Sequence, residues 1–357
     1  MIRQECFTKE WIQQVSTNLR YPDVNLIEKV IRAFSLVEML SDSGCPYIWK
    51  GGTALMILLG DNRHRLSIDV DIICPPGTDI EKFLQDFQKY GFYNVETMER
   101  IQRGKDIPKS HSKFFYRIAF LDNDANTGNI LLDVLFEDTH YHKTQRLPLI
   151  SPFIQWDGEP VMVNLPSVDD ILGDKLTAFA PNTSGIPYFK NGNDCNLEIA
   201  KQLYDIGRLF DAMTDLSVVA DAYNKISRVE LSYRRMEENP SISLQDTCNT
   251  ALCLSTRGKA GIGDFTALQS GISRLRSFMY LGKYQIEQAQ ADAAKAAYLS
   301  VLIQTGATRF ERYSGSIDGL WLPGNIPVKL GKLRLPSPEA YFYWVKTGEL
   351  LSAENSL

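Results

Sequence analysis

The segment that decides the fold is residues 50–73, which read KGGTALMILLGDNRHRLSIDVDII. It opens with two glycines ahead of an apolar run, and it closes with an apolar segment that carries two aspartates, Asp69 and Asp71. The run over residues 53–59 predicts a short helix, and residues 67–73 predict a strand. We therefore expect a Gly-Gly turn, a helix and a strand in this order.

The aspartates of this strand indicate a site for a cation. Residues two apart in a strand point to the same side, so Asp69 and Asp71 are expected to present their carboxylates together. Two such charges about 4 Å apart repel by roughly 1–4 kcal/mol, and a divalent cation between them reverses the sign. Asp133 stands in a second apolar segment, LLDVLF, where valine or leucine would suit a core strand better. Three carboxylates on adjacent strands predict a site for two Mg²⁺ or Mn²⁺ ions and for in-line phosphoryl or nucleotidyl transfer.

The two glycines fit the same chemistry. A Gly-Gly turn before a helix lets backbone N–H groups approach a triphosphate, and the Thr53 hydroxyl is a further donor. Arg65 and Ser67, just upstream of the aspartates, are expected to hold a phosphate or the end of the strand. Each feature alone has a simpler interpretation, since Gly-Gly turns are common and an acidic strand is often a solvated edge. Their occurrence together favours the nucleotide site.

Length and composition set the limits for the whole chain. Its 357 residues suggest about two domains, and 44% hydrophobic and 23% charged residues exclude disordered and collagen-like classes. The net charge of −5 means that nucleic acid would have to meet a local basic patch. No signal peptide and no membrane-spanning apolar run is evident, so we expect a cytoplasmic protein without membrane contact. Six cysteines without a CxxC pair are expected to be free thiols.

Periodicity divides the chain into a mixed front half and a helical back half. Two of the expected strands flank the turn-forming sequence DNDANTG and suggest a hairpin. Ser167, with Asp170 three residues later, is expected to cap the helix that contains Lys175. We therefore expect an α+β fold with a mixed α/β domain over residues 1–165 and a mainly helical domain over 166–357. The elements expected in the front half are helices at 8–43 and 79–90 and strands at 47–49, 114–120, 130–136 and 161–163; from 197 to 310 the pattern is helical, with loops near 238–242 and 256–264.

The motifs KGGTAL (residues 50–55) and RLSIDVD (65–71) resemble those of the nucleotidyltransferase AbiEii/AbiGii toxin family. This family lies within the DNA polymerase beta-like nucleotidyltransferase superfamily, and the resemblance extends over about residues 45–215. It implies a nucleotidyltransferase-like mixed sheet flanked by helices in the first domain. The helical domain would then contribute residues to the active-site cleft.

The resemblance also implies roles for individual residues. Lys175, in ILGDKLTAF, would hold the phosphates of the nucleotide and offset developing negative charge, unless it is simply a surface lysine. The terminal acidic motif of the family falls on KQLYDI, with its second acid at Asp205 and Gln202 in place of its first. The implied metal ligands are Asp69, Asp71 and Asp133, and the implied nucleotide-binding residues are Lys50, Gly51, Gly52, Thr53, Arg65 and Ser67.

The leading hypothesis is a metal-dependent nucleotidyltransferase that moves an NMP from an NTP to an acceptor and releases pyrophosphate. The family implies a type IV toxin, with tRNA or another macromolecule as acceptor and an antitoxin encoded nearby. Two alternatives remain at this point. One is a nucleotide- or protein-binding module without turnover, to which Gln202 gives some weight. The other is a transferase with a small-molecule acceptor, which a deep pocket next to the acids would favour.

Overall fold

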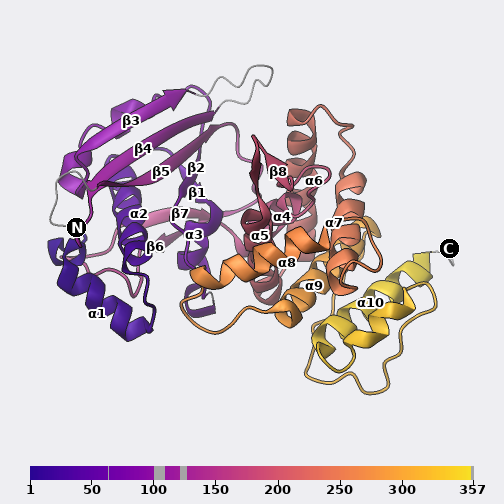
Figure 1. Cartoon of the computed structure of the whole chain (residues 1–357). Helices are drawn as coiled ribbons and strands as arrows, with labels where there is room; N and C mark the ends of the chain where they lie inside the picture. Colours follow the sequence, from indigo (N-terminus) through magenta and orange to yellow (C-terminus); the bar gives the residue numbers. More distant parts are fainter. Residues whose placement is uncertain (63, 100–108, 121–126, 355–357) are drawn as a thin grey trace. The chain divides into compact units, whose positions relative to one another are not determined.

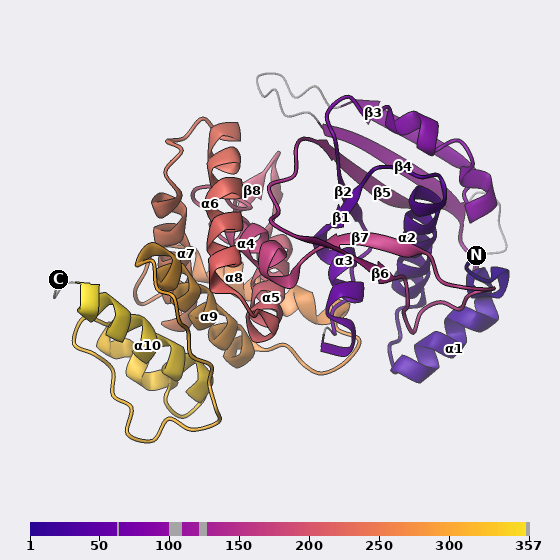
Figure 2. The ribbon, with the colours of Figure 1, turned by 180° about the vertical axis from the view of Figure 1, so that it is seen from behind.

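The structure is a computed structural model that describes residues 1–62, 64–99, 109–120 and 127–354 (Figures 1 and 2). Its chain forms two compact units. The first comprises Met1–Ser167 together with Phe278–Gly282, and the second comprises Val168–Ser277 together with Lys283–Leu357. The return of Phe278–Gly282 to the first unit has no counterpart in the pattern of the sequence, which predicts one change of architecture near residue 165.

A five-stranded mixed sheet forms the first unit, with the strand order β1-β2-β5-β4-β3. Neighbouring strands are antiparallel except for β2 and β5, which run parallel. The predicted α+β class is thereby confirmed, as is the hairpin of β4 and β5, although residues 121–126 of its turn lie outside the described residues. The strands are β1 (Ile48–Lys50), β2 (Val70–Cys74), β3 (Asn94–Glu99), β4 (Lys109–Arg117) and β5 (Thr127–Phe136).

Two further strands, β6 (Thr144–Pro148) and β7 (Met162–Pro166), pair as a separate antiparallel ribbon. Of the strands in this unit, β3 and β6 were not predicted. Both carry polar or charged residues at many positions, as in the TQRLP sequence of β6, so the alternation that identifies a strand is weak.

Helix α2 (Val24–Asp42) packs against β2 and β5 and supplies much of the core, including Phe34, whose ring meets that of Trp49 edge-on. The sequence predicts one helix over residues 8–43, but the structure has two, because α1 (Lys9–Leu19) ends where Arg20 adopts a left-handed conformation with φ 52°. A new helix then needs its own cap, and the Asp23 side chain provides it by accepting from the Leu26 N–H at 3.0 Å.

The helix predicted over residues 79–90 is wrong. The segment contains two 3₁₀ turns instead, η3 (Ile80–Phe83) and η4 (Phe87–Tyr90). Backbone carbonyls at its end bond to side chains of α2: the Tyr90 oxygen accepts from Ser35 Oγ at 2.8 Å, and the Gly91 oxygen accepts from Arg32 at 3.0 Å. These tertiary bonds replace the helical ones in a segment too short to be a stable helix by itself.

The second unit is helical, as predicted, apart from a small hairpin of β8 (Phe189–Lys190) and β9 (Asn193–Asp194). At its centre lies α9, whose many alanines let α7, α5 and α10 approach closely. No helix in the described part of the chain is long and apolar enough to cross a membrane. The helices are α4 (Val168–Ala178), α5 (Asn196–Ala212), α6 (Leu216–Tyr233), α7 (Pro240–Ser255), α8 (Phe265–Leu275), α9 (Ile286–Gln304) and α10 (Pro338–Glu354).

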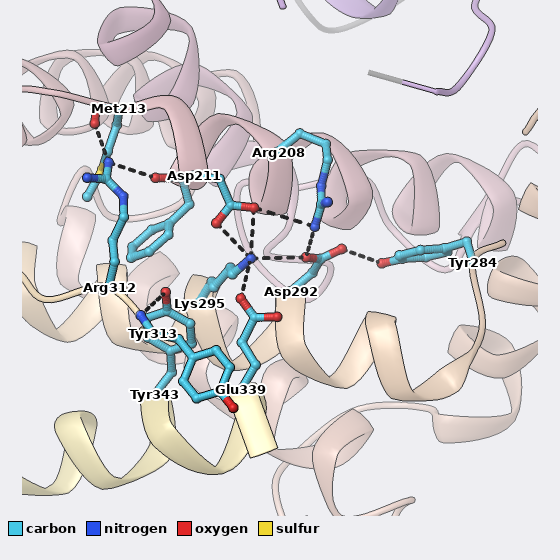
Figure 3. A network of polar contacts seen from close by, with 11 residues as sticks. Arg208, Asp211, Met213, Tyr284, Asp292, Lys295, Arg312, Tyr313, Glu339 and Tyr343 are labelled. Carbon is cyan, nitrogen blue, oxygen red and sulfur yellow. Dashed lines mark hydrogen bonds and ion pairs between the residues drawn. The ribbon is translucent and has the colours of Figure 1, made fainter. Parts of the chain in front are cut away.

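A network of charges joins α5, α9 and α10, with Lys295 and Asp292 buried at its centre (Figure 3). The Lys295 side chain is 1% exposed, and its Nζ lies 2.8 Å from Asp211 Oδ1 and 2.9 Å from Glu339 Oε1. Burial by itself lowers the pKa of Lys295, but the carboxylates around it produce a net rise. One ammonium group therefore links the last helix of the chain to the rest of the unit.

Asp292 is the most deeply buried acid of this network (Figure 3). Its Oδ1 lies 2.9 Å from the Arg208 guanidinium, and its Oδ2 accepts a hydrogen bond from the Tyr284 hydroxyl at 3.0 Å. Gly207 on α5 leaves the space that the carboxyl occupies, because a Cβ at that position would overlap it. Burial raises the pKa of Asp292, while Arg208 and Lys295 oppose the shift.

Lys295→Met is expected to lower the free energy of unfolding by about 1–3 kcal/mol, because the buried Asp292 loses one of its two cations and the partly exposed Asp211 and Glu339 lose the cation that they share. Urea denaturation followed by circular dichroism measures this loss. The matched control is Lys225→Met, which removes an exposed pair with Asp221 and should change stability by about 0.5 kcal/mol or less. Equal effects of the two substitutions would contradict a special role for the network.

Candidate functional site

A row of polar side chains crosses the sheet of the first unit. Lys50 on β1 is paired with Asp71 on β2, Asp71 with Asp133 on β5, and Asp133 with His111 on β4. Residues paired in this way lie about 5 Å apart and point to the same face of the sheet. All four are partly exposed, whereas their neighbours along each strand are buried. The row therefore lies on the face opposite to the one that supplies the core.

Asp69 lies just before this row. The structure starts β2 at Val70, so the predicted strand over residues 67–73 is three residues too long at its beginning. The hydroxyl of Thr53, which is fully buried, donates to the backbone carbonyl of Asp69. This bond ties the start of α3 (Gly51–Leu58) to the residues that precede β2. The Thr53 hydroxyl, predicted as a donor to phosphate, thus has a structural partner in the protein.

Both glycines make room for side chains of the site. Helix α3 begins at Gly51, two residues earlier than predicted, and Gly51 has φ +77°, a conformation that other residues rarely adopt. A Cβ at Gly51 would overlap the carboxylate of Asp71, and one at Gly52 would overlap the hydroxyl of Ser67. The N-terminal turn of α3 is therefore packed against the Asp71 and Ser67 side chains.

Arg65 is held where the chain returns to the first unit. The backbone of Arg65 forms an isolated antiparallel β-bridge with Met279. The N–H of the next residue, Leu66, donates to the Phe278 carbonyl at 2.8 Å. The Arg65 side chain is 1% exposed and donates to the Leu66 carbonyl at 3.0 Å, and a Cβ at Gly52 would lie 3.0 Å from its guanidinium. The sequence identifies Arg65 as a candidate, but not the segment that fixes its backbone.

His111 is the residue of the row that the sequence analysis missed. Its Nδ1 is hydrogen-bonded to Oδ1 of Asp133 on the neighbouring strand. The predicted strand began at residue 114, whereas β4 begins at Lys109. Continuing the alternation of KSHSKFFYR back from the buried Phe114 and Ser112 would have placed His111 on the partly exposed face.

Two of the three predicted metal ligands are direct neighbours in the structure. Asp71 and Asp133 pair in register, while Asp69 lies outside the strand. In the described part of the chain, no group of three or more His, Cys, Asp and Glu side chains has the arrangement of a metal site. Two carboxylates nevertheless fit Mg²⁺, which is typically bound by one or two carboxylates together with water and the phosphates of a substrate. The donor set thus fits a divalent cation that completes its coordination with water or with the phosphates of a substrate.

Lys175 and Asp205 form a cluster in the second unit. The Nζ of Lys175 on α4 lies 3.4 Å from Asp205 Oδ2 and donates to Gln202 Oε1 at 2.9 Å, and both acceptor residues are on α5. Asp205 is fully buried and Lys175 is 8% exposed. Gln202, the departure from the family motif, is thus a direct partner of Lys175 and adds no second negative charge beside it.

The sequence of this chain matches the model of a family described as "Nucleotidyl transferase AbiEii toxin, Type IV TA system" over residues 36–251, well over half of its length. The chain belongs to this family. The resemblance seen in KGGTAL and RLSIDVD is thereby confirmed. The match of this AbiEii-family protein includes the row of the sheet as well as Lys175, Gln202 and Asp205.

Solved structures give a likeness of fold. The nucleotidyltransferase toxin MenT4 of Mycobacterium tuberculosis H37Rv is 12% identical, with a TM-score of 0.53 over 96% of this chain and 98% of that chain. JHP933 of Helicobacter pylori is 14% identical, with a TM-score of 0.41 over 78% of this chain and 90% of that chain. No curated protein matches the sequence. At 12% identity, the likeness to MenT4 concerns the fold alone.

Gly51→Ala is expected to unfold at lower urea concentration than Gly44→Ala. Both glycines have positive φ, 77° and 73°, so both substitutions carry a backbone cost of about 1–2 kcal/mol. Only the Cβ at position 51 meets the Asp71 carboxylate, since nothing lies within 4 Å of the one at position 44. Most of the excess loss should disappear when Asp71→Ala is combined with Gly51→Ala, because only the Cβ of residue 71 then remains, 3.0 Å from the added Cβ; an undiminished excess in the double variant would contradict this account.

Proposed function

We propose that this AbiEii-family protein is a metal-dependent nucleotidyltransferase that transfers an NMP from an NTP to an acceptor. The observation that carries the proposal is the pairing of Asp71 with Asp133 on the partly exposed face of the sheet, with Asp71 packed against the N-terminus of α3. Carboxylates at this separation are stabilised by a cation, and a helix N-terminus favours phosphate groups. Membership of the nucleotidyltransferase family supports the same reaction class.

In the proposed reaction, an acceptor hydroxyl attacks the α-phosphorus of the NTP, the bond to the β-phosphate bridging oxygen breaks, and pyrophosphate leaves. Asp71 and Asp133, with Asp69 beside them, would hold Mg²⁺ or Mn²⁺. When bound, this metal supplies charge neutralisation and orientation of the phosphates. Asp133 also helps to activate the acceptor hydroxyl, whose proton is released to solvent. The NTP phosphates are bound by the backbone of Gly51 and Gly52 and by the side chains of Lys50 and Ser67. The buried Arg65 holds the chain at the start of the strand, and Thr53 positions Asp69 through its carbonyl.

For the helical unit we propose that Lys175 binds nucleotide phosphates and that Asp205 orients its ammonium group. A buried carboxylate at 3.4 Å holds the lysine in place, and the neutral amide of Gln202 fixes a second direction for its hydrogen bonds. Because Gln202 carries no charge, the net charge of the cluster around Lys175 is less negative, and so more favourable to an anionic ligand, than it would be with two acids.

We further propose RNA, with tRNA as the first candidate, as the acceptor, and an antitoxin encoded nearby as the partner that a type IV toxin requires. Two arginines of the second unit have partners within it: Arg312 donates to the Phe210 carbonyl at the end of α5, and Arg334 lies over the rings of Trp321 and Tyr341. The proposal of an RNA acceptor therefore does not rest on these two residues. A cavity of about 600 Å³ in the first unit is lined by Tyr47, Arg146 and others, but by none of the row, so it lends no support to a small-molecule acceptor at the acids.

Incubation of the protein with Mg²⁺, total cellular RNA and each α-³²P-labelled NTP in turn is expected to transfer label to RNA with at least one NTP. The variant Asp71→Asn/Asp133→Asn keeps side-chain size but removes both charges, and its rate should fall by about 100-fold or more. The same NTP labelled on the γ-phosphate should leave the RNA unlabelled. Absence of transfer to RNA, to protein or to the enzyme itself, despite metal-dependent nucleotide binding, would favour the non-catalytic module.

Lys175→Met is expected to reduce the same transfer rate by about 100-fold, because it removes a cation that binds the triphosphate. The matched substitution Gln202→Met removes one hydrogen-bond partner of Lys175 and leaves its pair with Asp205, so its rate should fall by about tenfold or less. Both are measured at saturating and at limiting NTP. If Gln202→Met were as defective as Lys175→Met, the effect would lie in the packing of α4 on α5.

A further inference from the structure

His111 and Asp133 form a cross-strand pair at the centre of the polar row. The side chain of His111 is 25% exposed and that of Asp133 is 38% exposed, so the pair lies at the surface of the sheet. Because β5 lies between β2 and β4, Asp133 has Asp71 on one side and His111 on the other. His111, a hydrogen-bond donor, thus lies on the side of Asp133 that faces away from Asp71.

The chemistry of the two groups determines the direction of the hydrogen bond. An ionised carboxylate only accepts, so Nδ1 of His111 carries the hydrogen and donates it to Oδ1 of Asp133. This bond uses one of the two carboxylate oxygens and restricts rotation of the carboxyl group. Oδ2 remains as the oxygen that can meet a cation. A carboxylate held in this way loses less conformational freedom when it binds metal.

A cross-strand pair of this kind adds only about 0.2–1 kcal/mol to the stability of the sheet. Strands β4 and β5 are joined along nine residue pairs by their backbone, and aspartate is a poor strand former at any of them. On the same partly exposed face of β4 and β5, the other cross-strand pairs include Lys113 with Leu131 and Phe115 with Asn129. Neither of these pairs joins two ionisable side chains. The pair therefore has the character of a ligand and the group that orients it.

We infer that His111 is a positioning residue that orients Asp133 for binding of the divalent cation. The inference rests on the proposed function, since it assigns a task to one residue of the proposed metal site. Hydrogen-bond partners of metal ligands typically change metal affinity by about 10- to 100-fold when they are removed. The same range is expected here.

The test compares three substitutions at His111 by titration of the purified protein with MnCl₂, with free Mn²⁺ measured by electron paramagnetic resonance. His111→Leu is expected to raise the Kd for Mn²⁺ by about 10- to 100-fold. His111→Asn places an amide nitrogen where Nδ1 lies and should remain within about threefold of the native Kd. His111→Gln carries the same amide one bond farther out and should resemble His111→Leu. Thermal unfolding of each variant verifies that it is folded.

Two controls separate this inference from the function on which it rests. Thr97→Val breaks the 3.2 Å hydrogen bond to Ser112 between β3 and β4, so it tests a change in the sheet away from Asp133 and should leave the Kd unchanged. Asp71→Asn/Asp133→Asn should abolish Mn²⁺ binding. If the double variant lost binding while His111→Leu kept the native Kd, the role of His111 alone would be overturned. His111→Gln replaces His111→Leu in this comparison if the Leu variant does not fold.

Two further outcomes are decisive. If His111→Asn were as weak as His111→Leu, the imidazole itself would be required, and the positioning role would be wrong. If the Asp71→Asn/Asp133→Asn variant bound Mn²⁺ like the native protein, the proposed metal site would fail, and the inference about His111 with it.

Discussion

The parallel pairing of β2 with β5 is the constraint on which the site depends. It is the one parallel contact of the five-stranded sheet, and its register sets Asp71 beside Asp133. A slip of β2 by one residue against β5 would turn Asp71 toward the core face and expose Val70 and Ile72. The burial of those apolar residues therefore enforces the register that brings the two acids together, so the core and the site are specified by the same alternation.

The two glycines at the start of α3 allow its backbone to pack closely against the side chains of the candidate site. The residue types alone predict that Gly51 and Gly52 bind phosphates. The structure shows that they also leave room for the side chains of Asp71 and Ser67. Both tasks require the same absence of a Cβ. A helix N-terminus with a carboxylate packed against it is also a place where a metal and a phosphate can meet. Under the proposed function, the structural demand on Gly51 and Gly52 and the demand of phosphate binding coincide.

The second unit is organised around buried charge as well as apolar packing. Lys295 and Asp292 join three helices, and Lys175 with Asp205 joins two. Such groups are costly to bury, so each must be paired, and the pairs constrain how the helices can pack. Gln202 fits this pattern, because it supplies a hydrogen bond to Lys175 without adding a charge.

By itself the sequence determined the α+β class, the strands that carry Asp71 and Asp133, and the family to which the chain belongs. These features depend on local periodicity and on motifs of a few adjacent residues. Only the tertiary structure decided that His111 meets Asp133, that residues 278–282 secure Arg65, and which acids are neighbours. Such contacts join segments far apart in the chain, and their partners leave no periodic signal, so pairing and register must be known before they can be seen.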